Sequence, residues 1–340
     1  MKTQRRMAFL SREDLRVAVI GLGKMGLVHS CILNVLPNVK LAAVCEKSGM
    51  TRRFLRKLFK NARMIDDAEK LSSLDLDAVY VTTPIPSHFA IAKLLYSEGI
   101  VQNIFVEKTL ASSYEQAKEI CMFARRFGGT NMVGYVRRFY VTFNKAKALL
   151  EADAIGEVRA FKTYGYSADF AESGETRVGG SRGGVLMDLG CHAIDLALWF
   201  FGDLDVETAK INSVSDGGSE DFVHFEVKAK DLEGEFDVSW CKPNYRMPEV
   251  GFAISGSKGV LEVNDDFVQL KLRDAKPLRW YRHDLNDNVD FWLGEPEYFR
   301  EDQHFVNLSL NNGEAEPNFE CAAKTDEIIA KVKSKAEENE

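Results

Sequence analysis

The chain has 340 residues, 45% of them hydrophobic and 28% charged, which is typical of a soluble globular protein with one large or two ordinary domains. The formal net charge of −7 argues against a general nucleic-acid-binding protein, and no apolar run is long enough to span a membrane. The six cysteines are scattered without a Cys-x-x-Cys pair, so we expect reduced thiols in the cytoplasm and no disulfide framework, zinc site or other metal site.

The first part of the chain alternates between strand and helix patterns. Short apolar runs rich in β-branched residues predict five strands, at 16–20, 41–45, 78–82, 104–106 and 132–135. Helical spacing and capping signals predict helices between them, at 25–36, 51–59, 87–99 with Ser87 as N-cap, and from a capping box at 112–115 to the glycines at 128–129. Repeated strand–helix–strand units predict a parallel sheet with helices on both faces.

The second part of the chain has a different pattern. A helix at 141–152, a strand at 157–166 and a helix at 187–201 precede short strands of alternating polarity over 206–283. Two further helices, at 298–310 and 319–333, close the chain. We therefore expect an α/β plus α+β protein: an N-terminal Rossmann dinucleotide-binding domain at 1–138, then a domain with a large, mostly antiparallel sheet at 139–340.

A glycine-rich turn directly follows the first predicted strand and opens the first predicted helix. It has the pattern G-x-G-x-x-G, and we expect it to bind a dinucleotide pyrophosphate through the residues Gly21, Leu22, Gly23, Lys24, Met25 and Gly26. The first glycine permits the tight turn, the second lets the pyrophosphate approach the backbone, and the third lets the helix pack on the strand. The free N–H groups at the helix N-terminus favour the anion.

An acidic residue, Glu46, ends the second predicted strand, twenty residues after Gly26. A carboxylate at this place accepts hydrogen bonds from the adenosine ribose and repels a 2′-phosphate, so we expect NAD. The basic residues nearby, Lys47, Arg52 and Arg53, leave NADP open as the alternative.

Five motifs occur in order along the chain. They are the glycine turn extended by His29, the segment VTTP at 81–84 with His88, EKT at 107–109, GYVRRF at 134–139, and GGVLMDLGCHAID at 183–195. Together they resemble the glucose–fructose oxidoreductase/inositol dehydrogenase/MocA family. In three places the chain departs from the family pattern: Thr109 replaces a usual proline, Val136 a frequent polar residue, and Ser181-Arg182 a third glycine.

The resemblance implies an NAD(P)-dependent oxidoreductase that acts on a secondary hydroxyl of a sugar, an inositol or a sugar derivative. It adds Thr83, Pro84, His88 and Glu107 to the expected cofactor-binding residues. We further expect substrate contacts at Arg138, Tyr164, Arg182 and Asp195. The small-molecule substrate is the expected partner, together with a second copy of the chain in a dimer or tetramer.

The predicted catalytic residues are Lys108, Asp188 and His192. Lys108 follows a parallel strand, at the edge where ligands of such sheets bind. If the segment after 187 is helical, Asp188, His192 and Asp195 project from one face, because they are spaced i, i+4, i+7. We expect His192 to act as general base and Lys108 to stabilise charge on the substrate oxygen in the crevice between the domains; Lys108 as the base is the alternative.

Other functions fit the same residues. They are a nucleotide-sugar dehydrogenase, an NAD-using glycosidase that oxidises its substrate transiently, and a cofactor-sensing protein without turnover. A glycosidase would show no net reduction of the cofactor, and the set of Lys108, Asp188 and His192 argues against a sensor.

Overall fold

The computed structural model describes residues 14–168, 183–213, 219–287 and 296–338. Within these ranges the chain forms two compact units, one from 1–107, 118–134 and 290–319 and the other from 108–117, 135–289 and 320–340. The first unit is interrupted at 108–117, and its second stretch ends at Gly134, four residues before the domain boundary expected at 138. The first unit also takes in 290–319, whereas two continuous domains were expected.

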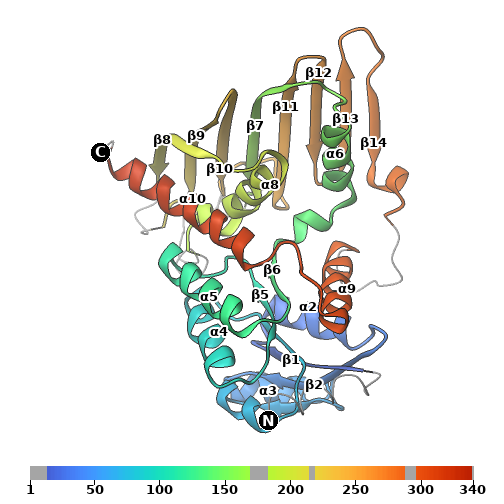
Figure 1. Cartoon of the computed structure of the whole chain (residues 1–340), viewed down its shortest axis with the longest axis vertical. Coiled ribbons are helices and arrows are strands. Elements are labelled where there is room, and N and C mark those ends of the chain that lie inside the picture. The colour runs from blue at the N-terminus through green and yellow to red at the C-terminus, as the bar shows by residue number, and fades with distance from the viewer. Residues whose placement is uncertain (1–13, 169–182, 214–218, 288–295, 339–340) are drawn as a thin grey trace. The chain divides into compact units, whose positions relative to one another are not determined.

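Six parallel strands form the sheet of the first unit, in the order β3-β2-β1-β4-β5-β6. Figure 1 labels β1, β2, β5 and β6 of this sheet. Their bounds are β1 Leu15–Ile20, β2 Val39–Cys45, β3 Arg63–Ile65, β4 Ala78–Val81, β5 Asn103–Glu107 and β6 Asn131–Gly134. The central strands β1, β4 and β5 are buried almost throughout, so their sequences are continuous apolar runs. The strand order reverses between β1 and β4, and sheets of this kind bind ligands beside that point, at the carboxyl ends of the strands.

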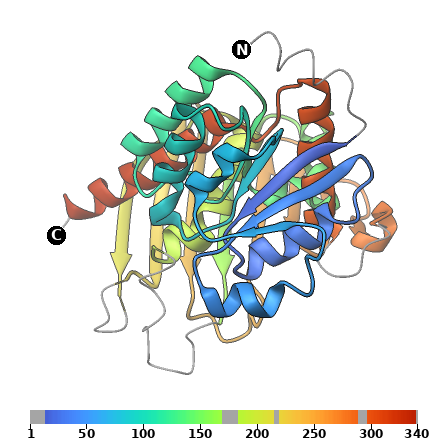
Figure 2. The ribbon, with the colours of Figure 1, turned by 90° about the horizontal axis from the view of Figure 1, so that it is seen from below.

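Helices cover both faces of this sheet. They are α2 Lys24–Leu33, α3 Gly49–Leu55, α4 His88–Ser97, α5 Tyr114–Phe127 and α9 Pro296–Asn311. Right-handed crossovers place α2 and α3 on one face and α4 and α5 on the other, as the view in Figure 2 shows. α9 packs against α2 and β1, which is why a late segment of the chain belongs to the first unit.

Eight strands form the sheet of the second unit, in the order β14-β13-β12-β11-β7-β10-β9-β8. Their bounds are β7 Val158–Tyr166, β8 Asp205–Asn212, β9 Phe222–Ala229, β10 Leu232–Ser239, β11 Glu249–Gly256, β12 Gly259–Asn264, β13 Phe267–Leu272 and β14 Leu278–Tyr281. All neighbours pair antiparallel except β7 and β10, which are parallel. The expected parallel and mostly antiparallel sheets are therefore both confirmed.

Helices of the second unit pack on one face of its sheet. α6 Val141–Glu151 contacts β12 and β13, α8 Cys191–Phe201 contacts β7 and β11, and α10 Phe319–Glu337 ends the described chain. A π-helical turn, η4 at Leu186–Gly190, precedes α8 where one regular helix over 187–201 was expected. A π turn holds more residues than an α turn, and Asp188 lies within it while His192 and Asp195 lie on α8.

Two smaller expectations also changed. The helix expected at 51–59 is the shorter α3, and β3 was not predicted, because its three residues include a single buried one, Ile65.

All six cysteines are free thiols, and no helix in the described part of the chain is long and apolar enough to cross a bilayer.

Candidate functional site

The three glycines of the turn after β1 have the three different roles that the sequence predicts. Gly21 has a φ of +92°, and a Cβ there would lie 2.8 Å from Thr83 Cγ2. A Cβ on Gly26 would lie 1.8 Å from the carbonyl oxygen of Gly21, so only glycine lets α2 pack this closely on the turn. At Gly23 an added Cβ would meet nothing within 4 Å. The turn thus leaves open space at Gly23, where a pyrophosphate would approach the backbone.

The start of α2 has no side-chain cap. Gly23 occupies the N-cap position, and the helix begins at Lys24 with Met25 and Gly26 in its first turn. The first N–H groups of a helix have no partner within the helix, and without a capping side chain they can bind an anion. The structure therefore brings together the residues expected at the pyrophosphate, and they fit a dinucleotide.

Glu46 lies next to the glycine turn, at the end of β2. Its carboxylate accepts hydrogen bonds from the backbone N–H of Leu22 at 2.9 Å and of Ser48 at 2.8 Å. Arg52 donates to the carbonyl oxygens of Glu46 and Lys47, so its guanidinium is engaged in holding this loop. This arrangement orients a carboxylate beside the turn and occupies one of the three basic residues that could have held a 2′-phosphate.

We predict that the chain binds NAD at least about tenfold more tightly than NADP, a difference of about 1.4 kcal/mol, because Glu46 repels the 2′-phosphate. Titration of both dinucleotides into the purified protein measures the ratio. The variant Glu46→Gln keeps the size of the side chain, removes its charge, and should bring the two affinities together. Tighter binding of NADP by the parent protein would show that Lys47 or Arg53 forms a phosphate clamp.

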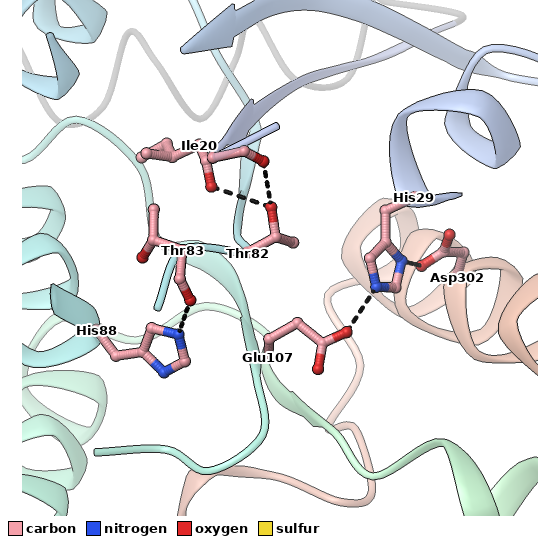
Figure 3. Close-up of polar contacts among 8 residues, drawn as sticks. Ile20, His29, Thr82, Thr83, His88, Glu107 and Asp302 are labelled. Atoms are coloured by element: carbon pink, nitrogen blue, oxygen red, sulfur yellow. Dashed lines mark hydrogen bonds and ion pairs between the residues drawn. The ribbon is translucent and has the colours of Figure 1, made fainter. Parts of the chain in front are cut away.

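The segment after β4 closes the other side of the turn (Figure 3). The hydroxyl of Thr82 lies 3.0 Å from the carbonyl oxygen of Ile20 and 2.8 Å from that of Gly21, and it donates to them. His88 is buried, and its Nε2–H donates to the carbonyl oxygen of Thr83 at 2.7 Å. His88 therefore shapes the loop that carries Thr83 and Pro84.

Ser87 does not cap α4 as expected. It takes part in the short helical turn η2 at Ile85–Ser87, which runs directly into α4, so its own backbone is already helical. Its hydroxyl bonds to the Thr83 hydroxyl and the Pro84 carbonyl oxygen instead of to the helix. The correction follows from the local backbone, because an N-cap residue must have non-helical dihedral angles.

Glu107 ends β5 and belongs to a buried network (Figure 3). Its Oε1 lies 3.0 Å from Nε2 of His29 on α2, and Nδ1 of His29 lies 2.8 Å from Oδ1 of Asp302 on α9. Burial alone would lower the pKa of His29, but the carboxylates of Asp302 and Glu107 raise it well above its usual value. The sequence motif singled out His29 and Glu107, whereas no sequence signal indicated Asp302.

Lys108 follows Glu107 and pairs with Asp188. Its Nζ donates to Oδ1 of Asp188 at 2.8 Å and also to the backbone carbonyl oxygen of the same residue. Both side chains are partly accessible, 20% and 25% exposed, whereas His192 is buried. The peptide bond between Lys108 and Thr109 is cis.

His192 lies on the first turn of α8, in the same unit as Lys108 and Asp188. Burial, followed by the positive charges of Arg137 and Lys108, lowers its pKa well below the usual 6.5. The ring of Tyr135 packs edge-on against it at 6.2 Å, and Nδ1 of His192 has no hydrogen-bond partner among the described residues. The lowered pKa favours the neutral form of His192, which is the form that a general base needs.

Arg137 was not expected at the site. Its guanidinium makes two hydrogen bonds to Asp265, at 3.1 and 3.0 Å, and its charge helps to keep His192 neutral. The residue lies within the motif at 134–139, but nothing in that motif distinguishes it from its neighbour Arg138.

The expected substrate contacts separate from one another. Arg138 and Asp195 form a buried bidentate ion pair at 2.9 and 2.8 Å, so each is the partner of the other. The hydroxyl of Tyr164 bonds to Glu249. The next residue, Gly165, faces Leu189 of the π turn, because a Cβ added to Gly165 would lie 3.1 Å from Leu189 Cγ. Because neighbouring strand residues face opposite sides, Tyr164 does not join Asp188 and His192. Arg182 lies outside the described residues.

Comparison with known proteins identifies the chain. Residues 15–135 match a family model described as "Oxidoreductase family, NAD-binding Rossmann fold", and residues 143–262 match the GFO/IDH/MocA C-terminal domain. The chain belongs to the GFO/IDH/MocA oxidoreductase family. This confirms the resemblance seen in the sequence, the NAD-binding Rossmann domain and the oxidoreductase class.

Among curated members of the GFO/IDH/MocA family, scyllo-inositol 2-dehydrogenase (NAD(+)) of Bacillus subtilis (strain 168) is 30% identical over 60% of this chain and 57% of its own length. D-Glucoside 3-dehydrogenase of Escherichia coli (strain K12) is 26% identical over 62% of this chain and 61% of its own length. The match thus spans less than two thirds of each relative. A solved structure of levoglucosan dehydrogenase in complex with NADH and levoglucosan has a TM-score of 0.86 at 18% identity, covering 96% of this chain and 97% of that one, and shows the same fold.

Proposed function

We propose that this chain is an NAD-dependent dehydrogenase that oxidises a secondary hydroxyl of a sugar, an inositol or a related polyol. The observation that carries the proposal is the accessible Lys108–Asp188 pair in one unit with the neutral His192. The family supplies the NAD-binding domain, and the relatives are named for an inositol and a glucoside. A polyol substrate needs both a charged donor to its oxygen and a base for its proton, and the second unit contains one of each.

Each residue has a separate task in this reaction. Lys108 donates a hydrogen bond from Nζ to the reacting hydroxyl oxygen and stabilises the negative charge that develops there. Asp188 accepts from the same Nζ, and so holds the ammonium group in place. His192 takes the hydroxyl proton on its neutral imidazole. When bound at the glycine turn and Glu46, NAD supplies the hydride acceptor.

A panel of polyols, sugars and nucleotide sugars, each assayed with NAD and with NADP, tests this proposal. We expect net formation of NADH, followed by its absorbance, with at least one polyol or sugar. Turnover of a glycoside without net NADH would favour the glycosidase alternative. Binding of NAD without turnover of any substrate in the panel would favour a sensor and contradict the proposal.

The usual pKa of a histidine is about 6.5, and that of His192 is lowered. We therefore predict that kcat does not change as the pH falls from about 7.5 to about 6.5. The base is then still neutral in the folded protein, and kcat falls only at more acidic pH. The pH profile of kcat at saturating NAD and substrate measures this. An acidic limb with a midpoint at or above 6.5 would show that the base is not a buried, positively surrounded imidazole.

We also propose a homo-oligomer, a dimer or tetramer, and a cytoplasmic location. The second sheet supports the first proposal, because a cavity on it combines the rings of Tyr164, Tyr166 and Phe267 with charged side chains, which a second copy of the chain can cover and pair with. The charged residues are Lys162, Glu235, Asp237 and Glu262. The six free thiols support the second. Sedimentation velocity of the purified protein measures the oligomeric state.

A further inference from the structure

Each of the two ring nitrogens of His29 contacts a carboxylate from a different element. Nε2 faces Glu107 of β5 at 3.0 Å and Nδ1 faces Asp302 of α9 at 2.8 Å (Figure 3). The ring itself is 0% exposed. A carboxylate is an acceptor only, so two such contacts are both satisfied when both nitrogens carry a proton, which makes the ring an imidazolium.

Aromatic rings surround the ring of His29. The rings of Tyr80 and Phe105, on β4 and β5, lie 5.5 and 5.1 Å from it, and Tyr298 of α9 lies 6.2 Å away. These rings exclude water and strengthen the charge-assisted bonds.

Further acidic groups of α9 lie near His29. Glu301 is fully buried, and burial raises its pKa well above the usual value, which favours the form without negative charge. Glu297 lies next to it on the same helix and pairs with Arg300 at 3.8 Å. The imidazolium is therefore matched by the two carboxylates that contact it.

The network joins three segments that matter to the cofactor and to the reaction. His29 lies on α2, whose N-terminus forms the pyrophosphate turn. Glu107 is the last residue of β5, and Lys108 follows it directly. Asp302 lies on α9, 273 residues further along the chain, and holds the other side of the ring. A buried ion pair costs free energy to form. One use of such a pair is to fix the position of the groups beside it.

We propose that His29 is a positioning residue for the reaction: clamped between Asp302 and Glu107, it fixes the carboxyl end of β5 from which Lys108 continues. This inference rests on the proposed dehydrogenase function. It differs from a purely structural role, because it places the effect of His29 on the geometry of one strand end and not on the stability of the unit as a whole. No step of the reaction passes through His29 itself.

The test is a double-mutant cycle between His29→Gln and Glu107→Gln, with kcat measured at saturating NAD. Glutamine is neutral and can keep one of the two hydrogen bonds, so His29→Gln should lower kcat about tenfold while the NAD dissociation constant changes by less than about threefold. If His29 acts through Glu107, the same substitution in the Glu107→Gln background should change kcat by less than about twofold. Full multiplication of the two losses would overturn the proposal.

A second readout does not depend on turnover. Hydrogen–deuterium exchange of the peptide over 103–110 should become faster in His29→Gln, while exchange over β1 and α2 stays that of the parent protein. The variant Asp302→Asn keeps an acceptor for Nδ1–H and should show a smaller effect of the same kind, which guards against a variant that fails to fold. Unchanged exchange over 103–110 would overturn the positioning role even if the protein proves not to be a dehydrogenase.

The matched control is His283→Gln, the same substitution at a side chain that is 79% exposed, and it should leave kcat and exchange unchanged. Histidine-labelled ¹⁵N spectra at neutral pH give the protonation state, with His29 assigned from the signal lost in His29→Gln. Both nitrogens of His29 should be protonated, because its pKa is raised well above 6.5. A neutral His29 at pH 7 would contradict the clamp.

Discussion

Gly23→Val is expected to abolish NAD binding while the protein stays folded. Gly23 has a φ of −69° and an extended ψ, which any residue can adopt, and a Cβ at this position meets no protein atom within 4 Å. The added side chain therefore fills only the space in front of the turn, where the pyrophosphate must approach the backbone. We expect the NAD dissociation constant to rise about 100-fold or more, which corresponds to about 2.8 kcal/mol.

Titration calorimetry with NAD, together with a thermal melt of each protein, checks this expectation. Gly26→Ala serves as the matched variant, since it adds a smaller side chain at a position where the protein has no room. Its Cβ would lie 1.8 Å from the carbonyl oxygen of Gly21, so this substitution should destabilise the fold itself. A folded Gly23→Val protein with parental affinity for NAD would show that the turn does not hold the cofactor.

Lys108→Ala and His192→Ala should each lower kcat by about 100-fold or more. The first removes the ammonium group that pairs with Asp188, and the second removes the neutral imidazole. Both groups act on the same substrate oxygen and its proton, so the double variant should lose much less than the product of the single losses. The NAD dissociation constant should stay close to that of the parent protein in all three variants, because neither side chain belongs to the NAD-binding turn.

The measurements are kcat and the NAD dissociation constant for the parent, both single variants and the double variant, on the substrate that the panel identifies. Lys70→Ala is the control for Lys108→Ala. The side chain of Lys70 is 59% exposed, and it also pairs with an aspartate, Asp66. Near-normal turnover of His192→Ala would assign the histidine a structural role. A kcat of Lys108→Ala equal to that of the parent protein would show that Lys108 takes no part in the reaction.

Local sequence patterns determined the elements, the parallel and the mostly antiparallel sheet, and the place of the dinucleotide turn. Each of these depends on residues close together in the chain: a buried strand is an apolar run, and the G-x-G-x-x-G turn places its three glycines within six positions. The single regular helix expected over 187–201 did not hold, because the chain forms a π turn at Leu186–Gly190 before α8. Local patterns also could not show that Ser87 continues a helical turn instead of capping one.

Only the tertiary structure decided which polar side chains meet. Asp302 reaches His29 from 273 residues away, Arg138 pairs with Asp195, and Tyr164 bonds to Glu249. No local pattern carries this information, because a side-chain partner depends on which elements pack together and on the face that each presents. The same packing shifts the pKa of each histidine: burial lowers that of His192, while the carboxylates of Asp302 and Glu107 raise that of His29, although both start from the same usual value.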